Sequence, residues 1–403
     1  MKKNFVRYII IFFISVIFTF YLFEFYLLYQ QDNIPSAKKK QIEQTIFQAS
    51  SKKEIYEKLK NTENISVVIP PINYTNISNS NLFSLSGIGS IKTIFCDENG
   101  YMTYYLSDRY GFNNPDTEWH KLEKTDKDLD GVVEYVLLGD SFVHGACVNR
   151  PNDIGSVLRD LSKKTVLNFG YVGNGALITY ATFREYVNFK ARNVLLFYFD
   201  NDLYDLRNEL KNEILIKYLN DKSFSQNLAK KQTEINSLSF SRIEKDFQKQ
   251  KDIDNAFRFN NEKKFYTKKN RLLKFIRLHQ TKNFFYSFYN LYTENLPYDE
   301  FKFIIKDINE RSKLRGGNVY IIFIPSYEKY SKYQIYPYFS DIIKKKIIYF
   351  LKKENIKIID IHEEVFKNHK DPLSLFNLSR WHFNEYGYEL MARVIFRETK
   401  NLK

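Results

Sequence analysis

The stretch YVLLGDS, residues 135–141, decides the fold. Four consecutive apolar residues run directly into Gly139, Asp140 and Ser141. A short apolar run that stops at a glycine turn is typical of a strand buried on both faces of a sheet. Ligands of open parallel sheets bind beyond the carboxyl ends of the strands, so Ser141 stands where chemistry is expected.

Four more short apolar runs recur along the chain, at residues 166–169, 194–198, 319–324 and 356–359. Helix-like segments separate them, at residues 154–162 and 177–190, with a crossover helix near residues 299–315. Strands that alternate with helices predict an α/β fold with a parallel sheet of about five strands and helices on both faces. The long stretch at about 205–298 cannot be a simple crossover and is interpreted as a helical insertion, a lid or a partner surface.

Three further segments carry polar or glycine residues at comparable places. A glycine-rich loop with Gly173 follows the second run, and Asn201 follows the third. Near the C-terminus, His382 stands just before a helix that Asn384 is expected to cap. Glycines allow a backbone N–H to approach a substrate, and an asparagine amide can donate to an oxyanion.

These four segments resemble the SGNH (GDSL) hydrolase superfamily, in a membrane-anchored bacterial form. The family's blocks carry Ser, Gly, Asn and His in that order, and the matching residues are Ser141, Gly173, Asn201 and His382. The resemblance implies a flavodoxin-like sheet and a serine acyl ester hydrolase. His382 would activate Ser141 as nucleophile, and Ser141, Gly173 and Asn201 would form the oxyanion hole.

One position departs from the family's pattern. An Asp usually stands three residues before the histidine, and here that residue is Ser379. Ser379, Asp371 or a backbone carbonyl could orient His382 instead, or activity could be lost. His144, three residues after Ser141, is a rival base with poor geometry, and a polar residue at the rim of the site is the favoured interpretation.

The N-terminus predicts a membrane anchor. Lys2, Lys3 and Arg7 precede an apolar run that reaches Leu28 and is interrupted by Glu24. That length suits one uncleaved membrane span. The first positive charges favour a cytoplasmic N-terminus and a catalytic domain in the periplasm or outside the cell, although the lysines at 38–40 compete.

The domain boundaries follow from these patterns. Residues 1–30 are the predicted anchor, 31–66 a stalk or surface helix, 67–130 a small β-rich preface, and 131–403 the hydrolase domain with its insertion. A polar, aromatic stretch at 107–114 either walls the pocket or forms a plain turn.

Composition limits the other classes of function. The net charge is +14, but the lysines are scattered, so no nucleic-acid partner is expected. Cys96 and Cys147 would pair in an oxidising compartment and be two buried thiols in the cytosol. No cofactor is expected, and the six histidines include no chelating pair at helical spacing, so no metal is expected.

The leading hypothesis is an esterase of O-acylated glycans or lipids at the cell envelope, held by its single membrane span. An O-acyltransferase could use the same Ser–His site. A non-catalytic protein that binds a glycan or a partner on a degenerate scaffold is the alternative from another class. The oligomeric state is not predicted.

Overall fold

The computed structural model describes most of the chain, which divides into two units. The described residues are 2–32, 52–71, 82–123, 131–263, 268–282, 284–285, 296–330, 335–378 and 381–400. One unit comprises residues 1–49 and 248–295, and the other comprises residues 50–247 and 296–403.

A five-stranded parallel sheet forms the centre of the larger unit. Its strands are β4 (Val132–Leu138), β5 (Val166–Asn168), β6 (Lys190–Tyr198), β7 (Asn318–Phe323) and β8 (Lys357–Asp360). They lie in the order β5-β4-β6-β7-β8, and every neighbouring pair is parallel. This is the flavodoxin-like order, so the predicted fold class is confirmed. From β4 the chain passes first to β5 on one side and then to β6 on the other side of β4. The order of the strands therefore reverses at β4, and the carboxyl end of β4 is the topological switch point where ligands of such sheets bind.

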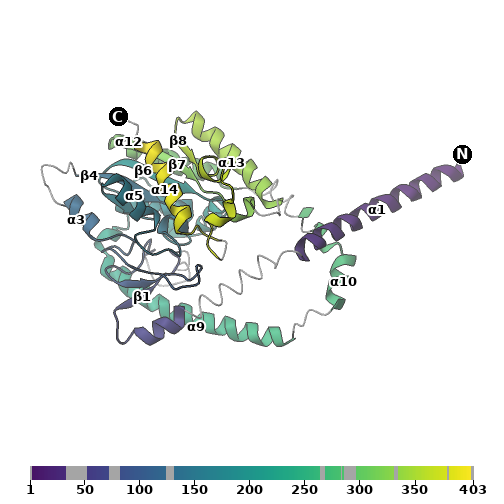
Figure 1. The fold of residues 1–403 in the computed structure, drawn as a ribbon, viewed down its shortest axis with the longest axis horizontal. Helices are drawn as coiled ribbons and strands as arrows, with labels where there is room; N and C mark the ends of the chain where they lie inside the picture. The colour runs from purple at the N-terminus through teal and green to yellow at the C-terminus, as the bar shows by residue number, and fades with distance from the viewer. Residues whose placement is uncertain are drawn as a thin grey trace. The chain divides into compact units, whose positions relative to one another are not determined.

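Helices cover both faces of the sheet, as the apolar runs predicted (Figure 1). The covering helices are α5 (Ile154–Ser162), α6 (Ala176–Tyr186), α12 (Tyr298–Leu314), α13 (Ile335–Lys353) and α14 (Glu385–Lys400). Residues on β4 divide between two hydrophobic clusters: Val136 and Leu138 belong to the one that includes α6 and α12, and Tyr135 and Leu137 to the one that includes α5 and α14. Alternate side chains of one strand therefore enter opposite faces, because successive side chains of a strand point in opposite directions.

A smaller sheet precedes the main one in the chain. It contains β1 (Ile65–Val67), β2 (Lys92–Ile94) and β3 (Tyr104–Leu106), with β1 parallel and β3 antiparallel to β2. Residues 52–59 form a helix before it, and α3 (Thr117–Glu123) follows it. Most of the stalk expected at 31–66 lies outside the described residues.

The stretch predicted as an insertion is largely helical where it is described. It contains α7 (Asp202–Glu209), α8 (Glu213–Asn220), α9 (Gln232–Lys263) and α10 (Lys268–Ile276). Helix α9 passes from the larger unit to the smaller one, which also contains α1 (Lys2–Asp32). Within α1, residues Asn4–Tyr29 include an 18-residue window with a mean hydropathy of 2.2, and they are long and apolar enough to cross a membrane.

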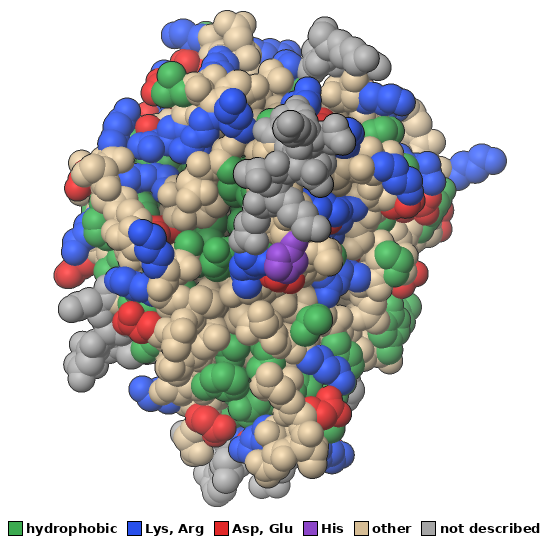
Figure 2. Space-filling view, turned by 90° about the vertical axis from the view of Figure 1, so that its left-hand side faces the viewer, with side chains coloured by type: hydrophobic (Ala, Val, Ile, Leu, Met, Phe, Trp, Pro, Cys, Tyr) green, Lys and Arg blue, Asp and Glu red, His purple; other side chains and the backbone are tan. Residues whose placement is uncertain are grey.

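Basic and acidic side chains are mixed on one face of the molecule. Lysine and arginine side chains lie over much of the face drawn in Figure 2, some of them side by side, with acidic side chains among them.

Candidate active site

Ser141 begins the four-residue helix α4 (Ser141–His144), directly after the turn that ends β4. The Asp140 carboxylate accepts a hydrogen bond from the Phe142 amide at 3.0 Å and caps this helix. Gly139 has a φ of 156°, and a Cβ there would lie 2.7 Å from Cγ2 of Val143. Only glycine fits this turn without displacing its neighbours. The serine is thereby presented at the carboxyl edge of the sheet.

His382 reaches the same point from the C-terminal end of the chain. It precedes Phe383, which forms an isolated bridge with Phe376, and it lies just ahead of α14. The expected cap of that helix is confirmed, because Asn384 accepts a hydrogen bond from the Gly387 amide at 3.0 Å. Nε2 of His382 lies 2.8 Å from Oγ of Ser141, although 241 residues separate the two in sequence.

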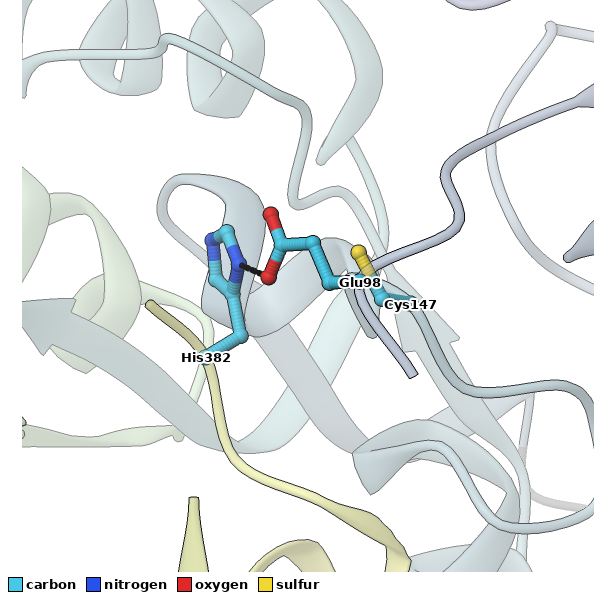
Figure 3. A group of neighbouring side chains, drawn as sticks. All are labelled: Glu98, Cys147 and His382. Carbon is cyan, nitrogen blue, oxygen red and sulfur yellow. Dashed lines mark hydrogen bonds and ion pairs between the residues drawn. The ribbon is translucent and has the colours of Figure 1, made fainter. Parts of the chain in front are cut away.

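The other ring nitrogen of His382 contacts Glu98. Nδ1 lies 2.7 Å from Oε2 of this carboxylate, which comes from the loop after β2 (Figure 3). An ionised carboxylate only accepts hydrogen bonds, so the proton of the neutral ring is on Nδ1. Nε2 is then free to accept the Ser141 hydroxyl proton. The three side chains form a Glu–His–Ser relay of the kind used in acyl transfer.

The relay is shielded from water. Only 15% of the His382 side chain and 9% of the Glu98 side chain are exposed. The Asn377 side chain donates a second hydrogen bond to Oε2 of Glu98, and the Asn377 amide donates to the His382 carbonyl at 2.8 Å. Both the acid and the imidazole are therefore held by the same short loop.

Charges around the ring set its proton affinity. Burial lowers the pKa of His382, but the charge and hydrogen bond of Glu98, with a further contribution from Asp140, raise it above its ordinary value. Burial also raises the pKa of Asp140 to about 6, against the opposing influence of His382. The relay thus favours the imidazolium, which must form when Ser141 loses its proton.

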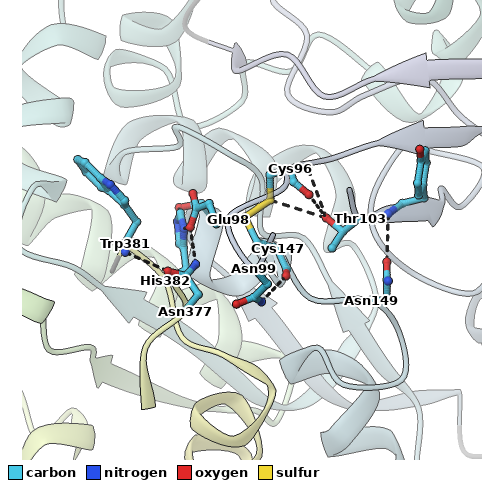
Figure 4. The surroundings of a disulfide bond; sticks show 11 residues. Cys96, Glu98, Asn99, Thr103, Cys147, Asn149, Asn377, Trp381 and His382 are labelled. Atoms are coloured by element: carbon cyan, nitrogen blue, oxygen red, sulfur yellow. Dashed lines mark hydrogen bonds and ion pairs between the residues drawn. A yellow bond between two sulfur atoms is a disulfide. The ribbon is translucent and has the colours of Figure 1, made fainter. Parts of the chain in front are cut away.

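A disulfide fixes the loop that carries Glu98. Cys96, two residues before Glu98, is bonded to Cys147, six residues after Ser141 (Figure 4). The side chain of Asn99 donates to the Cys147 carbonyl at 2.9 Å, and Thr103 donates to the Cys96 carbonyl at 2.7 Å. These links join the acid's loop to the segment that follows the serine.

The glycine loop after β5 adjoins the turn before Ser141. The Tyr171 amide and the Asn174 side chain donate to the Gly139 carbonyl at 3.2 and 3.4 Å. Gly173 is exposed in this loop with a φ of 75°. Within the described part of the chain, the amides of Ser141 and Gly173 donate to no protein acceptor. Both remain available to an oxyanion.

Asn201, the third expected oxyanion donor, is bonded through its side chain to a neighbouring carboxylate. It follows β6 and is exposed, and its side-chain amide donates to the Asp205 carboxylate at 2.7 Å. The amide nitrogen carries two hydrogens, so one is bonded to Asp205 and a second donor remains. Burial raises the pKa of Asp205 to about 6, so this bond weakens when Asp205 takes a proton.

Two buried side chains bond the backbone at the two ends of the glycine loop, which joins β5 to α6. Glu209 accepts hydrogen bonds from the Gly175 and Leu177 amides at 2.6 and 2.8 Å, at the start of α6. Asn114 bonds both backbone groups of Asn168, with its oxygen accepting at 2.8 Å and its nitrogen donating at 2.9 Å. The stretch at 107–114 is therefore a support for the end of β5.

The group that orients His382 differs from both expected residues. Asp371 is exposed, and its amide contacts His369. Ser379 lies outside the described residues. The sequence did not predict Glu98, because the family's pattern places the orienting acid just before the histidine, whereas Glu98 stands 43 residues before Ser141. The two cysteines were the available signal, since pairing them brings residues 96–98 beside the segment after Ser141.

His144 has no part in the relay. It is fully buried, stacks on Tyr171 with ring centroids 4.7 Å apart, and lies 4.3 Å from the ring of Phe95. Burial lowers its pKa to about 3. Neither ring nitrogen has a hydrogen-bond partner among the described residues. His144 is therefore a core residue and not one at the rim of the site.

One group in the described part of the chain has the ligand types of a metal site. Ligand atoms of Glu98, Cys147 and His382 lie within 4.8 Å of one another. The sulfur of Cys147 is committed to the disulfide, and the carboxylate and imidazole are bonded to each other. This donor set does not fit a metal ion while the disulfide is intact.

Comparison of the sequence with family models and with curated proteins finds no match. Among solved structures, a putative lipolytic protein of the G-D-S-L family from Desulfitobacterium hafniense is similar, with 14% identity and a TM-score of 0.37 over 66% of this chain and 98% of that one. An acetylxylan esterase from Geobacillus stearothermophilus shows 14% identity and a TM-score of 0.36, over 67% and 95%. A lipase/acylhydrolase from Enterococcus faecalis shows 14% and 0.35, over 67% and 97%. Likenesses of this strength establish no activity or substrate.

Proposed function

We propose that this chain is a serine-dependent acyl ester hydrolase of the SGNH type, held at a membrane by α1. The observation that carries the proposal is the continuous relay from Glu98 through His382 to Ser141, with both hydrogen bonds at 2.7–2.8 Å. A buried carboxylate, an imidazole and a serine hydroxyl in line have a direct use in nucleophilic catalysis.

The reaction follows from the proton positions. Ser141 Oγ attacks the ester carbonyl carbon while its proton moves to Nε2 of His382. Glu98 stabilises the resulting imidazolium through Nδ1. His382 then gives the proton to the departing alcohol, which leaves Ser141 acylated. Water attacks the acyl-enzyme, and the same imidazole takes the proton of the water and returns it to Ser141.

The negative oxygen of each tetrahedral intermediate needs donors. The amides of Ser141 and Gly173 are proposed as these donors, because they lie on adjoining turns and have no protein acceptor within the described residues. Asn201 is proposed as the third donor through the second hydrogen of its side-chain amide, since the first is bonded to Asp205. Each such donor is worth about 10²–10³ in rate.

The proposed substrates are O-acylated glycans or lipids at the cell envelope, with the catalytic unit in the periplasm or outside the cell. Two features support this location. Residues Asn4–Tyr29 have the length and hydropathy of a membrane span. The Cys96–Cys147 disulfide, beside the relay, requires an oxidising compartment to persist.

The proposal is tested with a fluorophosphonate probe and a chromogenic acetyl ester. The probe should label the detergent-solubilised full chain, and peptide mapping should place the adduct on Ser141. Ser141→Ala should lose both labelling and ester hydrolysis, whereas the matched control Ser223→Ala, at an exposed serine, should retain both. A folded wild-type protein that is neither labelled nor active would instead indicate a non-catalytic scaffold.

A further inference from the structure

Glu24 is the one acidic residue in the apolar stretch Asn4–Tyr29, and it is fully buried in the smaller unit. A carboxylate in such a stretch is costly unless it is paired. Its two oxygens accept hydrogen bonds from consecutive backbone amides, Gln280 at 3.0 Å and Thr281 at 2.7 Å. The acidic interruption of the span is therefore a docking point for a segment more than 250 residues away in sequence.

Aromatic contacts extend this docking along α1. The ring of Tyr21 lies 5.3 Å from that of Phe275, and its hydroxyl donates to the Ile276 carbonyl at 3.0 Å. Phe23 packs edge-on against Phe284 at 5.2 Å. We call residues 268–282, with 284 and 285, the interface segment. The side of the interface segment that faces α1 contacts one turn of that helix, from Tyr21 to Glu24.

The outer side of the interface segment is apolar and basic. Leu272, Leu273 and Ile276 are 40–60% exposed. Exposed basic side chains lie among them: Lys274, Arg277 and Lys282. Apolar residues accompanied by lysine and arginine on a short helix are typical of elements that lie in the plane of a membrane surface.

Glu24 is placed along α1 at the depth expected for the surface of a bilayer. It stands five residues before Tyr29, which is about 8 Å from the end of the apolar stretch at 1.5 Å per residue. The rings of Tyr26 and Tyr29 are exposed nearby, as in the aromatic belts of membrane proteins. A segment docked at Glu24 therefore lies near the boundary between acyl chains and headgroups.

We propose that the interface segment binds the surface of a bilayer that contains anionic phospholipid, with Leu272, Leu273 and Ile276 entering the acyl boundary. Lys274, Arg277 and Lys282 contact the headgroup phosphates. The proposal rests on the membrane anchor of the proposed function, but not on its chemistry. It gives the predicted insertion a different role from a lid, because a surface-bound segment ties the chain to the membrane at a second place.

The test uses the full chain reconstituted in vesicles of phosphatidylcholine and phosphatidylglycerol. The two native cysteines are bonded to each other, so an introduced cysteine can be labelled alone with a fluorescent dye that senses polarity. Leu272→Cys and the matched Lys274→Cys differ by two positions, which places them on opposite sides of α10. Nitroxide-bearing lipids should quench the dye at 272 severalfold more than at 274. Equal quenching at both positions would overturn the proposal.

A second variant tests the docking point. Glu24→Ala removes the acceptor of both amides, whereas Glu24→Gln keeps one oxygen. Trypsin cleavage after Arg277 in the vesicles should be severalfold faster in Glu24→Ala and intermediate in Glu24→Gln. Unchanged cleavage would contradict the docking. Labelling of Ser141 by the fluorophosphonate should be unaffected in both variants, so a failure here is distinguishable from a failure of the proposed chemistry.

Discussion

Replacing Glu98 by glutamine is the substitution that most sharply separates the observed relay from a bare Ser–His pair. Glutamine has nearly the same shape, but its amide cannot stabilise an imidazolium, and its nitrogen can force the proton onto the wrong side of the ring. The equivalent change in a well-studied serine protease lowers kcat about 10⁴-fold. The Glu98 bond to His382 is short and largely buried, so we expect a loss of similar size here.

At about 1.4 kcal/mol per tenfold change, this loss corresponds to about 5.5 kcal/mol of transition-state stabilisation. The assay is steady-state hydrolysis of a chromogenic acetyl ester, with the second-order rate of fluorophosphonate labelling as an independent readout. KM should change little, because Glu98 acts on the transition state through His382 and does not touch the ester.

Two controls isolate the effect. Asp97→Asn changes the neighbouring carboxylate in the same loop and should leave the rate near that of the wild type. Asp371→Asn should do the same, because Asp371 is exposed and its amide contacts His369. The reasoning is refuted if Glu98→Gln keeps the wild-type rate within a few-fold, or if Asp371→Asn loses as much activity as Glu98→Gln.

Three further outcomes are expected. The ascending limb of the pH–rate profile should have its midpoint at a pH above the ordinary pKa of histidine, near 6.5. His382 must be unprotonated to act as the base, and Glu98 raises its pKa. In Glu98→Gln the effect of burial dominates, and the midpoint should move to lower pH. Replacing Cys96 and Cys147 by serine should lower the free energy of unfolding by up to about 4 kcal/mol for the 51-residue separation, measured by urea denaturation, and should also reduce kcat by loosening Glu98; unchanged kcat would show that the disulfide does not position the acid. Glu209→Gln places an amide nitrogen against the backbone amides at the start of α6. It should reduce kcat by up to about 10²–10³, the effect of losing one oxyanion donor, with KM nearly unchanged. A change in KM alone would contradict the role of Glu209 in supporting the glycine loop.

The strand pattern could be predicted because each β-strand of the main sheet is a compact apolar run. Residues 135–138 and 319–324 lie within or beside β4 and β7, and the crossover helix expected at 299–315 is α12, Tyr298–Leu314. The start of β6 was placed four residues too late, at 194 in place of Lys190. Its first residues alternate between exposed and buried, and such alternation does not form a continuous apolar run.

The acid of the relay could not be read from local sequence. Glu98 follows a three-residue strand of the small sheet, and the one local signal is Cys96, which points to Glu98 only once it is paired with Cys147. Its role depends on long-range packing that brings the loop after β2 onto His382, 284 residues later. The docking role of Glu24 could not be predicted either. Its partners are backbone amides, and every residue except proline has one, so the sequence does not indicate which amides it bonds.

The protonation of the His382 ring tests the central claim most directly. Nitrogen NMR of the protein labelled with ¹⁵N-histidine can assign this ring by the signals that disappear in His382→Ala. Above the pKa of the ring, the account predicts a proton on Nδ1, bonded to the Glu98 carboxylate, and a bare Nε2 facing Ser141, with this pattern lost in Glu98→Gln. A neutral ring that carries its proton on Nε2 would contradict the account, because such a ring cannot accept the proton of Ser141.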